Sequence, residues 1–130
     1  MNVVLDTNVL VSGLINPDGT PAKILNLLIN ESITLFYDNR ILLEYKAVLN
    51  RDKFGFTAEM IDPLLDFIKT QGQFVTANPI TTFFEDEQDK IFLEVAQSAG
   101  VDYLITGNVK HFPENPMIVT PKEFIDKIDS

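Results

Sequence analysis

The sequence contains no cysteine and only one histidine, His111. The absence of cysteine excludes disulfides, thiolate zinc sites and cysteine nucleophiles. Any bound metal must therefore be held by oxygen ligands or by that single imidazole. Basic residues are also scarce, because 10 Lys and Arg stand against 19 Asp and Glu, which gives a net charge of −9 at pH 7. Such a chain is not a general nucleic-acid-coating protein, although cations bound among carboxylates reverse the sign of the charge locally.

Long apolar runs are missing as well. No stretch approaches the roughly 18 consecutive apolar residues of a membrane span. The apolar N-terminus, residues 1–15, lacks the basic region of a signal peptide and is interrupted by Asp6. We therefore expect a cytoplasmic protein that does not associate with membranes. The length of 130 residues and the hydrophobic share of 45% predict one globular domain over residues 1–130.

Short apolar runs alternate with longer segments of helical periodicity. The predicted strands are residues 2–5, 33–37, 73–76, 103–106 and 117–119. The predicted helices are residues 9–15, 20–30, 38–49, 57–71, 86–99 and 121–128, with Thr20, Thr57 and Thr120 as N-caps. Strands that alternate with helices indicate βαβ units. The sequence therefore predicts an α/β fold with a parallel sheet covered by helices on both faces.

Three carboxylates lie where this pattern would place a functional site. Asp6 directly follows the first strand, Glu44 lies on the apolar face of a helix, and Asp89 lies near the start of another helix. Ligands of parallel α/β sheets bind beyond the carboxyl ends of the strands. A half-buried carboxylate without a partner is costly, and a divalent cation would compensate for it. Mg²⁺ and Mn²⁺ prefer such oxygen ligands.

Each acid also has a purely structural explanation. Asp6 would satisfy loop amides after a strand, and Glu44 would extend from a boundary position to solvent. Asp86 and Asp89 suit the N-cap and third position of a helix, where negative charge is favoured. Only the joint placement of the acids favours a metal site over these explanations.

The segment Val3–Leu10 (VVLDTNVL) closely resembles the opening motif of PIN-domain proteins. The resemblance continues through Glu44 in the context LLEY, then through residues 86–96 and 100–108, so it covers essentially the whole chain in the right order. The chain looks most like the VapC-like branch of bacteria and archaea, the toxin components of toxin–antitoxin pairs.

This resemblance implies a three-layer α/β/α fold with a five-stranded parallel sheet in the order 3-2-1-4-5. It also implies a ribonuclease dependent on Mg²⁺ or Mn²⁺. The implied metal ligands and catalytic residues are Asp6, Glu44 and Asp89, and the implied supporting residues are Thr7, Asn8, Asp86 and Asn108. The implied partners are an RNA substrate, a cognate antitoxin protein and further copies of the same chain.

The sequence departs from the family pattern at two positions. Asn108 stands where many members carry an aspartate, and Gln88 stands where a further aspartate is common. Asparagine can ligate weakly through its carbonyl oxygen but adds no negative charge. With three carboxylates instead of four, the expectation of a second tightly held metal is weakened.

Lesser candidates surround this set. Lys90, Lys110 and His111 are possible substrate contacts, although lysines beside acidic clusters are commonly solvated partners. Another possible RNA contact is a basic group formed by Arg40, Lys46, Arg51 and Lys53. We expect the pairs Phe54/Phe56 and Phe83/Phe84 to pack in the core or at an interface and not to stack on bases. The predicted helices over residues 20–30 and 57–71 carry apolar residues. These residues could belong to the core, or they could form an interface with a second copy or an antitoxin.

The leading hypothesis is thus a metal-dependent ribonuclease of the toxin type. The alternative is a catalytically weak or inactive PIN-fold module that binds RNA or protein, which Asn108, Gln88 and the acidic charge favour. A third hypothesis, a phosphatase with Asp6 as nucleophile, would usually require a second aspartate where this chain has Asn8.

Overall fold

A computed structural model describes residues 1–129 of the chain. Its strands are β1 (Asn2–Leu5), β2 (Thr34–Tyr37), β3 (Gln73–Phe74), β4 (Tyr103–Ile105) and β5 (Ile118–Val119). Its α-helices are α1 (Thr7–Ile15), α2 (Thr20–Ile29), α3 (Asn39–Leu49), α4 (Ala58–Gln71), α5 (Glu87–Ala99) and α6 (Pro121–Ile128). Two short 3₁₀ turns are η1 (Asp52–Phe54) and η2 (Val109–His111).

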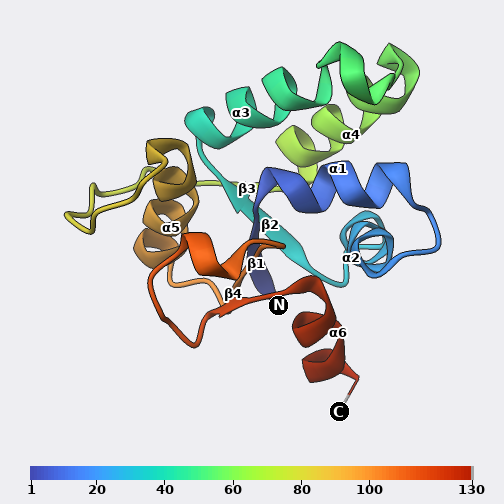
Figure 1. Cartoon of the computed structure of the whole chain (residues 1–130). Helices are drawn as coiled ribbons and strands as arrows, with labels where there is room; N and C mark the ends of the chain where they lie inside the picture. Colours follow the sequence, from blue (N-terminus) through green and yellow to red (C-terminus); the bar gives the residue numbers. More distant parts are fainter. Residues whose placement is uncertain (130) are drawn as a thin grey trace.

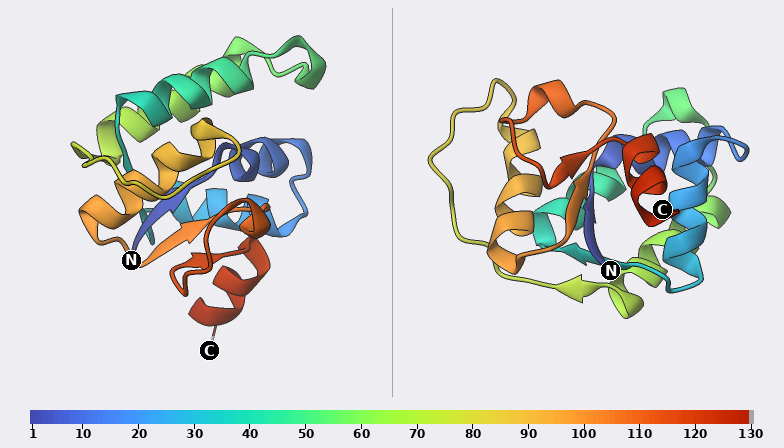
Figure 2. Two further views of the ribbon diagram at one scale, coloured as in Figure 1. Left: turned by 60° about the vertical axis from the view of Figure 1, so that its left-hand side comes forward. Right: turned by 90° about the horizontal axis from the view of Figure 1, so that it is seen from below.

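The five strands form one sheet in the order β3-β2-β1-β4-β5, and all pairs are parallel. The predicted strand order and α/β class are therefore confirmed. Figure 1 shows α5 on one side of the sheet and α2 and α6 on the other, and the view from below in Figure 2 shows the same three layers.

The central strand β1 explains why the sheet needs cover on both faces. Val3, Val4 and Leu5 are all 0% exposed, so successive side chains on opposite faces are equally buried. A near-continuous aliphatic run of this kind is typical of a parallel strand between two helical layers. Helix α5 contacts β1, β2 and β4 on one face, while α6 contacts β4 and α2.

The ends of several elements differ from the prediction. Helix α1 begins at Thr7, two residues earlier than predicted, because Asp6 takes the N-cap position directly after β1. The predicted strand over 73–76 ends at Phe74. Thr20 is the first residue of α2 and Gly19 takes the cap position, so the predicted Thr20 cap is wrong. Thr57 holds the N-cap position of α4 but makes no side-chain cap hydrogen bond.

Other helix ends match their sequence signals. Thr120 and Glu123 form a complete capping box at the start of α6. Gly100 ends α5 with φ of +62°, a left-handed conformation that glycine adopts without strain. Within residues 1–129, no helix is both long enough and apolar enough to cross a membrane.

The carboxyl ends of β1 and β4 meet at the same edge of the sheet. Leu5 pairs with Ile105 in parallel register, and the Asp6 amide donates to the Ile105 carbonyl at 2.9 Å. The chain leaves β1 into α1 and leaves β4 into the loop that holds Thr106 and Asn108. Two segments 100 residues apart are thus brought side by side at this edge.

Candidate functional site

A cavity of about 230 Å³ lies at this carboxyl edge. Its walls come from the start of α1, from α3 and the residues after it, from the start of α5 and from the loop after β4. The lining residues are Asp6, Thr7, Asn8, Glu44, Val48, Arg51, Asp86, Gln88, Asp89, Phe92 and Asn108. All three carboxylates predicted as metal ligands and all four predicted supporting residues therefore line one cavity.

Asp6 is held from two directions. Its carboxylate is buried, with 6% of the residue exposed, and its Oδ2 accepts hydrogen bonds from the Thr106 hydroxyl at 2.7 Å and from Asn8 Nδ2 at 3.1 Å. Thr106 is itself 0% exposed. These two donors fix the orientation of the Asp6 carboxylate at the bottom of the cavity.

The loop after β4 is tied into the same network. The Thr106 hydroxyl accepts from the Asn108 amide at 2.9 Å, and Asn8 Oδ1 accepts from the Gly107 amide at 3.1 Å. Asn8 therefore joins Asp6 to the loop and serves as both donor and acceptor. Its amide chemistry suits this bridge, whereas an aspartate has only acceptors when ionised.

Glu44 comes from α3, between the buried residues Ile41 and Val48 of the same helix. The next residue, Tyr45, is 0% exposed and its hydroxyl donates to the Leu5 carbonyl at 2.5 Å. This bond connects α3 to the peptide that directly precedes Asp6. It holds the helix that carries Glu44 against the end of β1, next to Asp6.

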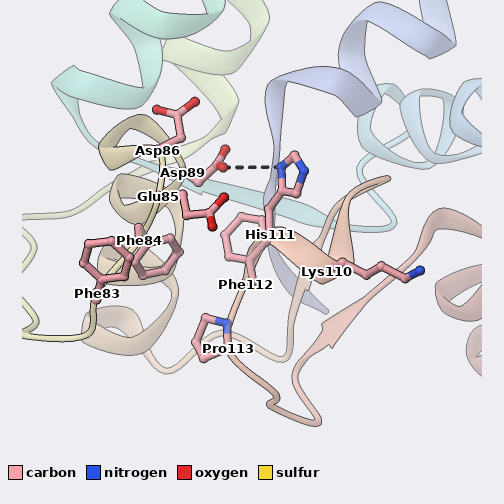
Figure 3. Close-up of a pocket in the computed structure, with 9 residues that line it drawn as sticks. All are labelled: Phe83, Phe84, Glu85, Asp86, Asp89, Lys110, His111, Phe112 and Pro113. Carbon is pink, nitrogen blue, oxygen red and sulfur yellow. Dashed lines mark ion pairs between the residues drawn. The ribbon is translucent and has the colours of Figure 1, made fainter.

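Asp86 and Asp89 come from the start of α5. Asp86 is the N-cap and its Oδ1 accepts from the Gln88 amide at 2.9 Å, while Asp89 is at the third helical position. Asp89 also lies 3.6 Å from His111 Nδ1, the pair joined by the dashed line in Figure 3. Asp86 therefore caps α5 and also lines the cavity. Its structural role as a helix cap does not exclude a functional role at the site.

Burial raises the pKa values of all three predicted metal ligands, and repulsion by neighbouring acids adds to this effect at Glu44 and Asp89. The pKa of Asp89 rises to about 6, first because burial disfavours its charge and then because Asp6 and Asp86 repel it. Burial also raises the pKa of Asp6, against the opposing effect of the Thr106 hydrogen bond. Burial raises the pKa of Glu44, which Arg51 partly offsets. The carboxylates therefore form an electrostatically strained group that a cation would relieve.

The donor chemistry fits a hard divalent cation. The available ligands are carboxylate, hydroxyl and amide oxygens, the set that Mg²⁺ and Mn²⁺ prefer. The Thr7 hydroxyl is a buried oxygen in this wall without a hydrogen-bond partner in the described part of the chain. Within residues 1–129, however, no group of three or more Asp, Glu or His side chains is positioned to hold a metal ion. The acids share a cavity, but they do not meet at one point as the sequence analysis expected.

The predicted cationic residues are distributed unevenly. Arg51 lines the cavity, whereas Lys90 lies 3.9 Å from Glu87 and is not among the lining residues. Arg40 pairs with Asp38 at 2.8 Å and with Glu94 at 2.7 Å, so it connects α3 to α5. The basic group that the sequence suggested is thus divided between one residue at the cavity and others outside it.

Lys110 and His111 line a neighbouring cavity and not the one around Asp6. Phe84 belongs to the core, as predicted, but Phe83 is 82% exposed and is not a core residue. Phe54 and Phe56 stack with ring centroids 5.5 Å apart, and both are half-buried against the core.

Two residues at the site were not predicted from the sequence. Thr106 was taken as the last residue of a strand, and Tyr45 as part of an apolar helix face. The available signal was that each is a buried polar side chain that needs a hydrogen-bond partner. Which partner it finds depends on the packing of β4 and α3 against β1.

Comparisons with known proteins agree with the fold. A family model described as PIN domain matches residues 2–110. An uncharacterized protein of Methanocaldococcus jannaschii, MJ1680, is 33% identical over 147 aligned positions, which cover 99% of this chain and 92% of that protein.

Proposed function

The chain belongs to the PIN-domain family, and on that premise we propose that it is a metal-dependent ribonuclease that hydrolyses RNA phosphodiesters. PIN domains are generally nucleases, and they usually use divalent metal ions. One observation carries the proposal for this chain. Asp6, Glu44 and Asp89 come from three separate segments, yet they line one cavity at the carboxyl edge of the sheet.

In this proposal Asp6, Glu44 and Asp89 hold Mg²⁺ or Mn²⁺ through their carboxylate oxygens. The bound cation supplies positive charge that favours an ionised water and a phosphodiester at the same site. The positive charge of a bound cation would offset the burial and the acid repulsion that raise the pKa values of Glu44 and Asp89. The buried Thr106 and Asn8 contacts keep Asp6 fixed, so Asp6 is the preorganised member of the set.

The remaining residues act on the substrate and its surroundings. Arg51 provides the fixed positive charge on the cavity wall and attracts a phosphate of the RNA backbone. Lys110 and His111 lie beside the cavity, where they can contact a neighbouring phosphate. Asn108 supplies a neutral amide in the wall of the same cavity, which can orient a water or an RNA oxygen without adding charge.

The experiment that tests this function compares Asp6→Asn with the parent protein. Purified protein is incubated with structured RNA in Mn²⁺, in Mg²⁺ and in EDTA, and the products are resolved by electrophoresis. The parent should cut RNA only with the metal, and Asp6→Asn should lose at least roughly a hundredfold in rate while keeping the parent circular-dichroism spectrum. Asp66→Asn, at an exposed position on α4, is the matched control and should keep the parent rate. Equal rates in Asp6→Asn and the parent would refute the assignment.

We further propose that the protein is the VapC-like toxin of a toxin–antitoxin pair and forms a homodimer or higher oligomer. Ile29 on α2 and Met60 on α4 are large apolar residues with 57% and 41% exposure, and they lie on the helices suggested as interfaces. Induced expression should arrest bacterial growth, and Asp6→Asn should not. Light scattering of the purified protein reports the oligomeric state.

A catalytically quiet binding module is the competing proposal. Two observations support it. Asn108 stands in place of a fourth carboxylate, and the side chains of the acids do not meet at one point. This alternative predicts RNA binding that does not change with Asp6→Asn and no RNA consumption in Mn²⁺. The electrophoresis experiment above therefore distinguishes the two proposals directly.

A further inference from the structure

A second cavity adjoins the carboxylate cavity and shares Asp86 and Asp89 with it. Its volume is about 410 Å³, and Figure 3 shows the residues that line it. One wall comes from the segment before α5 and the other from the loop after β4. A group bound there is therefore next to the site at which the proposed function places the scissile phosphodiester.

The aromatic rings in this cavity have two different roles. Phe84 and Phe112 are buried at 3% and 7% exposure and pack edge to face with centroids 5.8 Å apart, so they form a rigid apolar surface. Phe83 is 82% exposed, and Figure 3 places it at the outer rim. A phenyl ring that contributes so little to the core remains available to stack on a flat ligand.

The charge on the cavity walls decides which part of an RNA can enter. Glu85, Asp86 and Asp89 make the side formed by the start of α5 strongly acidic. A phosphate is repelled from such a surface, whereas an uncharged nucleobase is not. Lys110 provides positive charge on the opposite side, and Figure 3 shows its side chain extending away from the phenylalanines. The base is thus favoured inside the cavity and the phosphates outside it.

We propose that this cavity binds one unpaired nucleobase of the RNA substrate, next to the bond that is cut, and that it prefers guanine. The inference rests on the proposed ribonuclease function for its position relative to the cut. Sequence-selective RNA recognition commonly uses unstacked bases placed on aromatic side chains and read at their Watson–Crick edge. Phe83 is the stacking residue in this proposal, and Glu85 is the reading residue.

The preference for guanine follows from the acceptor chemistry of Glu85. Its ionised carboxylate only accepts hydrogen bonds, and Figure 3 shows it turned toward the wall formed by His111 and Phe112. Guanine presents two adjacent N–H donors on its Watson–Crick edge, which match the two carboxylate oxygens. Adenine, cytosine and uracil each place an acceptor beside their donor on that edge, and this acceptor would face a carboxylate oxygen.

The first experiment uses nucleosides without phosphate and without metal, so it does not depend on catalysis. Guanosine, adenosine, cytidine and uridine are each titrated into ¹⁵N-labelled protein in EDTA. Guanosine should shift the amide signals of residues 83–86, 111 and 112 more than the other three. Phe83→Ala should weaken guanosine binding roughly tenfold. Phe83→Tyr, which keeps a ring, should bind as the parent does.

Glu85→Gln tests the reading residue. The amide removes the charge and replaces one acceptor by a donor, so the preference for guanosine over adenosine should fall to near unity while stacking persists. Phe83 and Glu85 are both exposed, so neither substitution threatens the fold. Absence of guanosine shifts in the parent would overturn the proposal, as would an unchanged preference in Glu85→Gln.

The second experiment maps cleavage positions in an unstructured RNA that contains all four bases. The parent should cut next to guanosine, and the positions that Glu85→Gln cuts should show little base preference. Guanosine binding without RNA cleavage would support the base site and contradict the nuclease function. Cleavage without base preference, together with absent guanosine shifts, would support the nuclease function and overturn the base site.

Discussion

The Thr106 hydroxyl donates a 2.7 Å hydrogen bond to Asp6 Oδ2, although 100 residues separate the two in the sequence. Both side chains are buried, so water does not replace this bond when it is lost. The same hydroxyl accepts from the Asn108 amide. One small side chain therefore connects the carboxylate of Asp6, directly after β1, with the loop after β4.

Removal of the Thr106 hydroxyl should damage both stability and cleavage. Thr106→Val keeps the shape but leaves the Asn108 amide and Asp6 Oδ2 each short of a partner, which should cost about 1–3 kcal/mol. Urea unfolding measures this loss, and the cleavage rate should fall in parallel because Asp6 loses its fixed orientation. Thr106→Ser keeps the hydroxyl and should recover most of both properties. Equal loss in the Ser and Val variants would contradict this explanation, because only the Ser variant retains the hydroxyl.

Tyr45 should act as a positioning residue for Asp6. Tyr45→Phe removes the bond to the Leu5 carbonyl, which should lower the free energy of unfolding by about 1 kcal/mol and reduce kcat more than KM. Tyr37→Phe is a matched control, because the Tyr37 hydroxyl donates to the Lys69 carbonyl away from the cavity. Tyr37→Phe should leave kcat unchanged. A similar fall in kcat for both variants would argue against positioning.

The free energy of unfolding should change with pH because Asp89 titrates at a different pH in the folded and unfolded states. Its pKa is about 6 in the folded protein and near 3.8 when unfolded, so its charge opposes folding fully above pH 6. This cost falls as the pH drops through 6, is small at pH 4 and disappears below pH 3.8, where the carboxyl becomes protonated in both states. Asp89→Asn should therefore stabilise the metal-free protein at pH 7.5 by about 1 kcal/mol, allowing for solvent screening and the lost helix-terminus contact.

The matched control for this prediction is Asp66→Asn, an exposed aspartate on α4. Urea unfolding in EDTA at pH 7.5 and pH 4 gives the two free energies for each variant. The advantage of Asp89→Asn should be near zero at pH 4, and Asp66→Asn should show little difference at either pH. An advantage of the Asp89 variant that is independent of pH would contradict the electrostatic explanation.

Divalent metal should stabilise the folded protein. At 100 times the dissociation constant, Mn²⁺ should add about 2.7 kcal/mol, which corresponds to roughly 10 °C in Tm for a domain of this size. Asp6→Asn should lose most of this shift. NaCl at matched ionic strength is the control for general screening of the net charge of −9. An equal Mn²⁺ shift in Asp6→Asn would place the cation elsewhere.

A fourth carboxylate at the cavity should strengthen metal binding. Asn108→Asp adds a hard anionic ligand to the wall of the cavity that contains Asp6, so the Mn²⁺ concentration needed for half-maximal cleavage should fall roughly tenfold. The metal-free protein should lose about 0.5–1 kcal/mol of stability, because the new charge repels Asp6 and Asp89. Asn26→Asp adds the same charge at an exposed position of α2 and should change neither property.

The sequence by itself determined the fold class and most of the elements. Alternation of strand and helix segments is a local property, and the signals at Asp86, Gly100 and Thr120 act within one turn of the chain. The strand order came from the ordered resemblance to PIN-domain proteins, and the metal-ligand set came from the placement of the three acids together with that resemblance. The order is confirmed, while the ligand set stays a prediction. Only β3 and the starts of α1 and α2 differed noticeably, as expected where neighbouring elements decide an end.

The tertiary structure decided which side chains face one another. The bonds from Thr106 to Asp6 and from Tyr45 to Leu5 join residues 100 and 40 positions apart, and no local pattern encodes them. It also left Phe83 exposed and buried Phe84, although the two are adjacent in sequence. The acids line a shared cavity but do not meet at one point. The physical reason is that local preference fixes which segments form strands and helices. Packing of β1, β4, α3 and α5 against each other fixes the distances on which binding and chemistry depend.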